Sequence, residues 1–253
     1  MRKRLLDIFY PVLSVCLLVS IWAIAAAAVG EQLLLPTPAQ TVRTLWKLLT
    51  AKSRAFWIGL GHTFLRALAA YAICVIVSLP LAVAARVRPV RRIVSPLMTV
   101  VRSVPTMAVI FLLLLWAGAK SAPVYVAVTV ILPTMYAAFV SALDGVDRGL
   151  VEMSDVYRVP VRRRLTQLYI PSLVPTLVSS ATYLSLGLKL VIAAEAIAMT
   201  AKSLGMLLIQ ANTAIETARL LALAVAAVLA GFCIEGLASL VRIPLKRRGY
   251  DFT

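Results

Sequence analysis

The stretch LVEMSDVYRVPVRRRLTQLYIPSLVP, from Leu150 to Pro175, interrupts a chain that is otherwise mostly apolar. Acidic residues come first and a run of arginines follows. Up to Arg158 the apolar residues fall at helical spacing. Val159–Pro160 predicts the end of that helix, because the residue before a proline avoids the α region. The stretch therefore predicts a short amphipathic helix held between two apolar segments.

The composition around this stretch is that of an integral membrane protein. The 253 residues are 62% hydrophobic, with a mean hydropathy of +0.95, whereas soluble domains are about 45–50% apolar. The net charge of +16 comes from basic residues that flank apolar segments and do not interleave with aromatics. Orientation in a bilayer explains that pattern better than nucleic-acid binding does. We predict an all-α integral membrane protein with one domain, residues 1–253.

Six apolar segments are long enough to cross a bilayer as helices, which takes about 20 residues each. They are residues 11–29, 59–84, 94–117, 122–142, 169–199 and 217–241. The first is expected to be a retained helix, because a signal peptide has a shorter apolar core. The fifth is long enough to be kinked. Most Lys and Arg residues outside the spans lie on the side that holds both termini and the loop 143–171, which predicts that this side is cytoplasmic.

The patterns of common catalytic sites are absent from the sequence. His62 is the single histidine, and Cys16, Cys74 and Cys233 lie far apart in apolar segments, so no metal-ligand spacing appears. There is no phosphate-binding P-loop and no nucleophile elbow. We therefore expect no catalytic residue, no metal and no cofactor in this chain.

Charged residues inside the predicted spans are candidates for a solute path. A charge at mid-bilayer costs about 2.5–3.5 kcal/mol on insertion scales, so it usually faces a cavity, pairs or reaches toward the interface. Glu195, Lys189 and Arg102 are the predicted path residues. For Glu195, a structural ion pair with Arg66, Arg102 or Lys189 is an equal alternative.

The opening stretch resembles the cytoplasmic coupling loop of permease subunits in binding-protein-dependent ABC importers. That loop begins Glu-Ala-Ala, has a glycine some four residues on and ends in a hydrophobic-Pro pair. Here Glu152-Met153-Ser154 stands at the first position and Ile170-Pro171 at the last. Arg158 stands at the usual glycine.

Four further segments resemble, in chain order, the nitrate/sulfonate/taurine group of these permeases. They are LLLPTPAQTV (33–42), GHTFLRALAAY (61–71), RSVPTMAVIFLLLLWAG (102–118) and LGLKLVIAAEAIAMTAKSLGMLL (186–208). Tyr71 departs from the pattern, which usually has glycine there. The resemblance covers most of the chain from about residue 33 and implies the type I ABC importer permease fold.

The resemblance also implies a function and its partners. Such a chain is a permease subunit of the bacterial cytoplasmic (inner) membrane and not an enzyme. It pairs with a second permease copy, often as a homodimer, and docks on two cytoplasmic ABC ATPase subunits, which bind ATP and Mg. An extracytoplasmic solute-binding protein delivers the solute. A small anion (sulfonate, taurine, nitrate) or a related solute would then cross by alternating access.

The resemblance assigns an ATPase-coupling site to one short run and one proline. Its residues are Glu152, Met153, Ser154, Asp155, Val156, Tyr157, Arg158 and Pro171. Within it, Glu152 would contact the ATPase or cap the short helix. The side chains of Met153, Val156 and Tyr157 would fill a cleft on the ATPase.

Other interpretations remain open at this point. The stretch could be a solvated loop whose arginines only fix the topology. A secondary transporter would show internal repeats and helices broken at matching positions, and the sequence shows neither. A membrane enzyme would need convergent His, Asp or Ser groups. A non-transporting membrane anchor subunit is opposed only by the charges inside the spans.

Overall fold

A computed structural model describes residues 2–31, 33–50 and 53–247. Its helical elements are α1 (Arg2–Val29), α2 (Pro38–Leu49), α3 (Arg54–Ala84), α4 (Arg88–Ser103), α5 (Thr106–Asp144), α6 (Arg148–Val156), α7 (Val161–Arg164), the π-helical turn η1 (Leu165–Tyr169), α8 (Ile170–Ser179), α9 (Thr182–Ala198), α10 (Leu204–Thr213) and α11 (Thr217–Arg247). These described ranges contain no strand. The predicted all-α class is confirmed for them.

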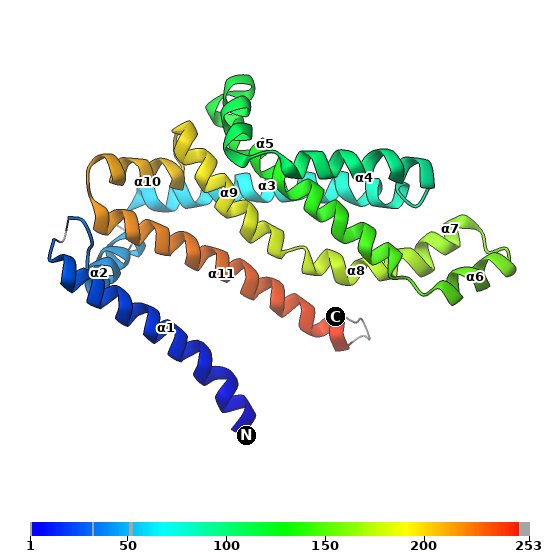
Figure 1. Cartoon of the computed structure of the whole chain (residues 1–253), viewed down its shortest axis with the longest axis horizontal. Coiled ribbons are helices and arrows are strands. Elements are labelled where there is room, and N and C mark those ends of the chain that lie inside the picture. The colour runs from blue at the N-terminus through cyan, green and yellow to red at the C-terminus, as the bar shows by residue number, and fades with distance from the viewer. Residues whose placement is uncertain (1, 32, 51–52, 248–253) are drawn as a thin grey trace.

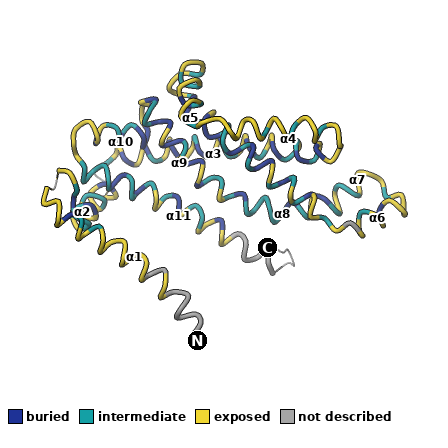
Figure 2. Tube along the Cα trace, viewed as in Figure 1, coloured by how far each residue is buried: buried dark blue, intermediate teal, exposed yellow. Residues whose placement is uncertain are grey.

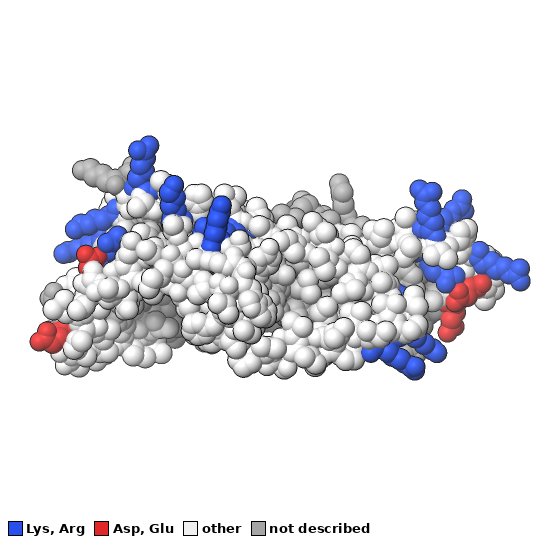
Figure 3. Space-filling model, turned by 90° about the horizontal axis from the view of Figure 1, so that it is seen from above, with Lys and Arg blue, Asp and Glu red and all other residues white. Residues whose placement is uncertain are grey.

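The long helices run roughly along the long axis of the molecule (Figure 1). Helices α2 and α10 lie at one end, which we call the α2 end, and α6 and α7 lie at the other, the α6 end. Helix α1 slants away from the others. Seen from above, Lys and Arg gather toward the two ends, with a wide uncharged band between them (Figure 3). This distribution is typical of a bundle that crosses a bilayer along its long axis.

Three described helices, α3, α5 and α11, are long and apolar enough to span a membrane. The segment Val161–Ser179 and helix α9, which meet at a 45° bend, would make a fourth span. The apolar part of α1, Leu13–Val29, is shorter. The chain is therefore a multi-pass membrane protein. The number six and the side of the termini stay predictions, and residues 1 and 248–253 lie outside the described part.

The structure corrects the predicted span 94–117, which is divided between two helices. Helix α4 ends at Ser103, Val104 is extended (φ −70°, ψ 130°) and α5 begins after Pro105. The proline explains the break, because it forces the preceding residue out of the α region. The expected gap before the span 122–142 is also different. It is a bend within α5 at Gly118, whose φ of 71° suits glycine.

The other predicted spans agree better with the helices. Residues 11–29, 59–84, 122–142 and 217–241 lie within α1, α3, α5 and α11, respectively. The fifth span, 169–199, is broken between α8 and α9, in line with the kink expected there. Apolar length thus predicts where these helices run, and local backbone chemistry decides where they break.

The core lies where α3, α5, α9 and α10 cross (Figure 2). After Phe56, the buried positions on α3 hold small residues, among them Ala67, Ala70 and Cys74, which are fully buried. Small side chains let helix backbones approach closely, which matters in a membrane because lipid gives no hydrophobic drive for helix association. Bulky partners from α5, such as Ile131 and Met135, fill the space against them. This core holds in place the features described next.

Candidate functional site

Helix α6 forms the start of the loop that sequence analysis singled out. The Asp147 side chain caps it by accepting a hydrogen bond from the Gly149 N–H at 2.8 Å. The helix ends at Val156, so the prediction of a short helix ending before Pro160 is confirmed. Glu152 is exposed and does not cap the helix, because Asp147 holds that position.

The turn after α6 has the shape that a glycine would favour. Arg158 has a φ of 49°, in the left-handed region, and the Val159 N–H donates to the Ser154 carbonyl at 2.9 Å. A side chain in this region costs roughly 1 kcal/mol relative to glycine. The glycine of the related loops is therefore replaced here without loss of the left-handed turn.

Arg164 holds this turn against α7. Its Nη2 lies 2.7 Å from Asp155 Oδ1 and donates to the Ser154 carbonyl at 3.1 Å. A cation bonded to a carbonyl of the last helical turn also interacts favourably with the helix dipole. The turn is thus fixed by the Arg164 side chain through the Asp155 carboxylate and the Ser154 carbonyl, which offsets the cost of the left-handed Arg158.

The α6 unit presents apolar side chains to its surroundings. Met153, Val156 and Tyr157 are 53%, 78% and 76% exposed. A contiguous exposed apolar patch on an ordered element marks an interaction surface. Ser154 is buried instead, and Pro171 lies in the first turn of α8, where its missing N–H is tolerated.

Arg86 connects several elements at the α6 end of the bundle. Its Nη1 donates to the Leu143 carbonyl at 3.3 Å and to Asp144 Oδ1 at 3.2 Å. Its Nη2 donates to the Tyr169 hydroxyl at 3.2 Å, and the guanidinium lies over the Tyr169 ring. Asp144 also accepts from Arg91 and raises the pKa of that guanidinium through the hydrogen bond and its charge. The ends of α3 and α5 and the turn η1 are therefore linked beside α6.

A buried polar network lies nearer the α2 end. Glu195 on α9 is fully buried, and its Oε1 pairs with Arg66 Nη1 at 2.6 Å. Its Oε2 accepts from Thr63 Oγ1 at 2.8 Å and from the Gly205 N–H at 3.4 Å. The Thr63 hydroxyl oxygen in turn accepts from the Leu204 N–H at 2.9 Å. The network connects α3, α9 and α10. Of the three ion-pair partners considered for Glu195, the structure pairs it with Arg66.

Two close approaches complete this region. A Cβ on Gly205 would lie 2.5 Å from both the Ala196 nitrogen and the Glu195 Cβ, so α10 meets α9 at a distance that only glycine allows. The Thr200 hydroxyl donates to the Ala119 carbonyl at 2.7 Å, next to the bend of α5. The connection between α9 and α10 is thus held against the bend in α5.

A cavity of about 400 Å³, which we call the polar cavity after its charged and hydrogen-bonding side chains, opens between α3 and α5 beside this network. Its polar lining is His62, Arg66, Lys120, Ser121 and Tyr125, and its apolar lining is Leu65, Ala69, Ile73 and Val124. Arg66 is the residue shared by the cavity and the buried network.

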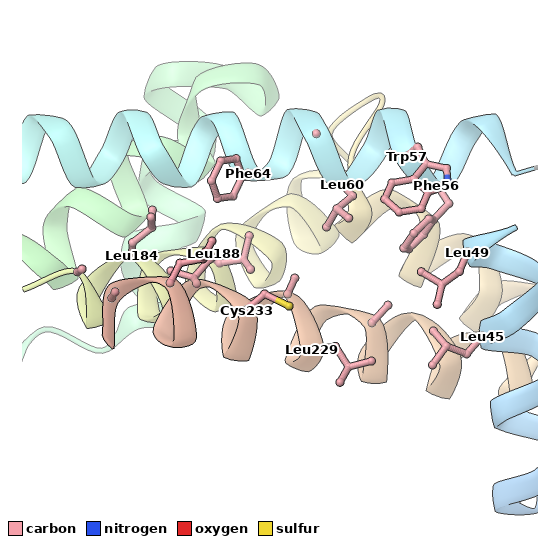
Figure 4. A pocket seen from close by; sticks show the side chains of 17 residues that line it. Leu45, Leu49, Phe56, Trp57, Leu60, Phe64, Leu184, Leu188, Leu229 and Cys233 are labelled. Atoms are coloured by element: carbon pink, nitrogen blue, oxygen red, sulfur yellow. The ribbon is translucent and has the colours of Figure 1, made fainter. Parts of the chain in front are cut away.

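An apolar groove of about 710 Å³ lies on another side of α3 (Figure 4). Helix α3 contributes Phe56, Trp57, Leu60 and Phe64, and side chains from α2, α9 and α11 complete it. Figure 4 shows Leu45 and Leu49 of α2 at one end of the groove and Cys233 of α11 pointing into it. The two sides of α3 therefore differ sharply in chemistry.

The comparisons with known proteins agree with this architecture. A family described as "Binding-protein-dependent transport system inner membrane component" matches residues 75–242. The chain belongs to this family. A solved structure of the MetNI methionine ABC transporter, in inward-facing conformations, matches with a TM-score of 0.60 and 19% identity over 72% of this chain and 92% of that one. At this identity the likeness shows the fold, which is that of type I ABC permeases. No curated protein matches the chain.

The permease does not bring the three predicted path residues together. Glu195 is buried in the network, whereas Lys189 is exposed on α9, where its Cε lies beside Gly231 of α11. Arg102 is exposed at the end of α4, in a cavity that also includes Asp144. A path role for these residues stays a prediction.

Sequence analysis missed the set that the fold does bring together. His62 and Arg66 are one helical turn apart on α3, which is a visible signal for a shared polar side. Lys120 and Tyr125 join them only because α5 bends at Gly118 and runs back along α3. No sequence spacing predicts that meeting.

Proposed function

We propose that this permease is the membrane subunit of an ATP-driven importer of the bacterial cytoplasmic membrane, in the nitrate/sulfonate/taurine-type group. It pairs with a second permease copy and crosses the membrane six times, with both termini in the cytoplasm. Two ABC ATPase subunits bind ATP and Mg and drive alternating access. An extracytoplasmic binding protein supplies the solute, a small anion of the sulfonate, taurine or nitrate kind.

The observation that carries this proposal is the exposed apolar surface on α6, which we call the coupling surface: Met153, Val156 and Tyr157. Its side chains project from a capped helix whose last turn is fixed by Arg164. A rigid apolar knob between charged residues suits insertion into a cleft on a soluble partner. Arg164 joins α6 to α7, and Arg86 joins the end of α5 to the turn η1 that follows α7, so a displacement of α6 would reach α3 and α5.

The test is copurification of an ATPase with the chain when it is expressed with its gene neighbours. The double variant Met153→Ala/Tyr157→Ala removes most of the coupling surface. Central interface side chains contribute roughly 2 kcal/mol or more each, so the recovered ATPase should fall at least tenfold. The control is Trp46→Ala, which removes an equally exposed aromatic at the α2 end and should leave recovery unchanged.

Two results would contradict the proposal. One is that no ATPase copurifies with the native chain under any nucleotide condition. The other is that the double variant and the native chain recover equal amounts of ATPase. That result would favour the interpretation of the chain as a non-transporting membrane anchor subunit.

A further inference from the structure

We propose that the polar cavity between α3 and α5 binds the solute, and that this solute is a small organic monoanion with a short apolar body. This inference rests on the proposed function, because it assumes that the chain lines a solute path. It goes further by assigning the site to His62, Arg66, Lys120, Ser121 and Tyr125 and by defining the shape of the ligand.

The charge balance of the cavity favours an anion. Arg66 is already paired with Glu195, so those two charges cancel. Lys120 is exposed and makes no ion pair with any described residue, which leaves one uncompensated positive charge. Ser121, Tyr125 and His62 also line the cavity and add hydrogen-bonding groups to it. A single anionic group would meet one net charge and several donors.

Glu195 has a positioning role in this arrangement. Its carboxylate holds Arg66 Nη1 from the buried side, while the guanidinium borders the cavity. A guanidinium is a planar fork with five donors, so one anchored edge leaves others for a ligand oxygen. The network therefore fixes a donor of the cavity without adding net charge to it.

The depth of the cavity indicates that this side of α3 meets water. Counted from residue 59, where the predicted span begins, His62 lies about 4.5 Å and Arg66 about 10 Å along α3 at 1.5 Å per residue. Polar and charged side chains at such a depth are costly against lipid and usually face a water-filled cavity. The apolar groove carries no such group and has the chemistry of a surface that meets acyl chains or another apolar helix.

The distribution of the lining defines the shape of the ligand. The charged or ionisable side chains His62 and Lys120 lie toward the α2 end, whereas Ala69, Ile73 and Val124, with Tyr125 beside them in sequence, lie further along the same two helices. A ligand with its anionic head at the α2 end would therefore place an apolar body against the inner residues. The volume of about 400 Å³ falls in the range of small-molecule sites. A bare inorganic anion would leave the apolar part unused.

The first experiment measures which side of α3 is wet. Single cysteines replace neighbouring residues, Leu65→Cys in the cavity and Phe64→Cys in the groove, in a background where Cys16, Cys74 and Cys233 are alanine. Both side chains are exposed in the chain, at 60% and 38%, so exposure alone does not separate them. In membranes containing the assembled transporter, a charged methanethiosulfonate reagent should modify Leu65→Cys at least tenfold faster than Phe64→Cys.

The second experiment measures the sign of the charge. For Leu65→Cys, the rate with an anionic methanethiosulfonate is divided by the rate with a cationic one, and this ratio is normalised to a free thiol. We expect this normalised ratio to be on the order of ten, because a nearby positive charge attracts the anionic reagent and repels the cationic one. Lys120→Gln should lower the ratio toward one. The control Lys47→Gln, on α2, should leave the ratio unchanged.

The third experiment tests the ligand class by protection of Leu65→Cys. Butane-1-sulfonate should slow modification more than nitrate does, and butylammonium and butan-1-ol should not slow it. Equal protection by the cation or the alcohol, an unmodified Leu65→Cys, or a ratio unaffected by Lys120→Gln would each overturn the inference. These readouts measure the cavity and not the recovery of ATPase, so loss of ATPase copurification overturns the proposed function, while a dry or uncharged cavity overturns only this site.

Discussion

The two sides of α3 are built from neighbouring residues and yet belong to different environments. Phe64 lines the apolar groove and Leu65 lines the polar cavity, and both are exposed in the isolated chain. What separates them is their neighbours. On the cavity side, Arg66 and Glu195 form a mostly buried ion pair, whereas the groove side is lined by apolar and aromatic side chains and one thiol. In a membrane protein, exposure therefore has to be interpreted together with the chemistry around it.

The same comparison shows what holds the helices together. On the groove side, lipid is as apolar as the side chains, so burial there gives little drive for association. On the cavity side, α3, α9 and α10 share hydrogen bonds and an ion pair whose Glu195 carboxylate is fully buried. We expect the polar side to dominate the stability of this end of the bundle, and the following variants test that expectation.

The largest effect is expected for Glu195→Ala. It leaves Arg66 without its partner in a mostly buried position, and breaking a buried pair typically costs about 3–5 kcal/mol. Thermal unfolding in detergent, followed by tryptophan fluorescence, should show a large fall in Tm. Glu235→Ala is the matched control, because Glu235 on α11 makes no hydrogen bond or ion pair with the described residues. Equal shifts for the two variants would contradict the dominance of the polar side.

Gly205→Ala tests the close approach of α10 to α9. The added Cβ would lie 2.5 Å from backbone and side-chain atoms of α9, so the helices must separate and stretch the bond to Glu195. Overpacking of this kind costs about 1–3 kcal/mol, and the same unfolding assay measures it. Gly236→Ala, on α11, places its Cβ in open space and should not destabilise the protein. An unchanged Tm for Gly205→Ala would mean that α10 can move away from α9 without loss of stability.

The sequence was sufficient for part of this picture. The α6 helix and its end were predicted because Val159–Pro160 is a local signal that no tertiary contact overrides. The helices at 59–84 and 217–241 were predicted because their apolar segments are longer than those of helices buried in the core of a soluble protein. The segment 94–117 is not one continuous helix as predicted, because average hydropathy ignores the break at Pro105.

The site was harder to predict than the helices. Glu195 had three candidate partners, and only the packing of α9 against α3 selects Arg66. The cavity needs α5 to bend at Gly118 and bring Lys120 to His62, which is a property of the fold and not of any spacing. The coupling surface was easier, because all its residues belong to one short helix and the turn after it.

A smaller effect is expected for Thr63→Val, which keeps the shape of the side chain and removes its hydroxyl. Glu195 loses one donor and the buried Leu204 N–H loses its acceptor, which costs about 1–2 kcal/mol. The control is Thr213→Val, since that hydroxyl is exposed and bonds only within its own helix. If both variants have the same Tm as the native chain, the network positions its side chains and does not contribute to stability.

The smallest effect, and the opposite sign, is expected on the groove side for Gly61→Ala. Gly61 lies inside α3, and a Cβ there meets nothing within 4 Å. Alanine stabilises a helix interior by about 0.5–1 kcal/mol relative to glycine, so the Tm of the chain alone should rise slightly. The same variant in the assembled transporter sharpens the comparison. A gain there too would mean that the groove meets lipid, which yields to a methyl group. A gain in the chain alone and a loss in the assembly would mean that a helix of another subunit packs against Gly61.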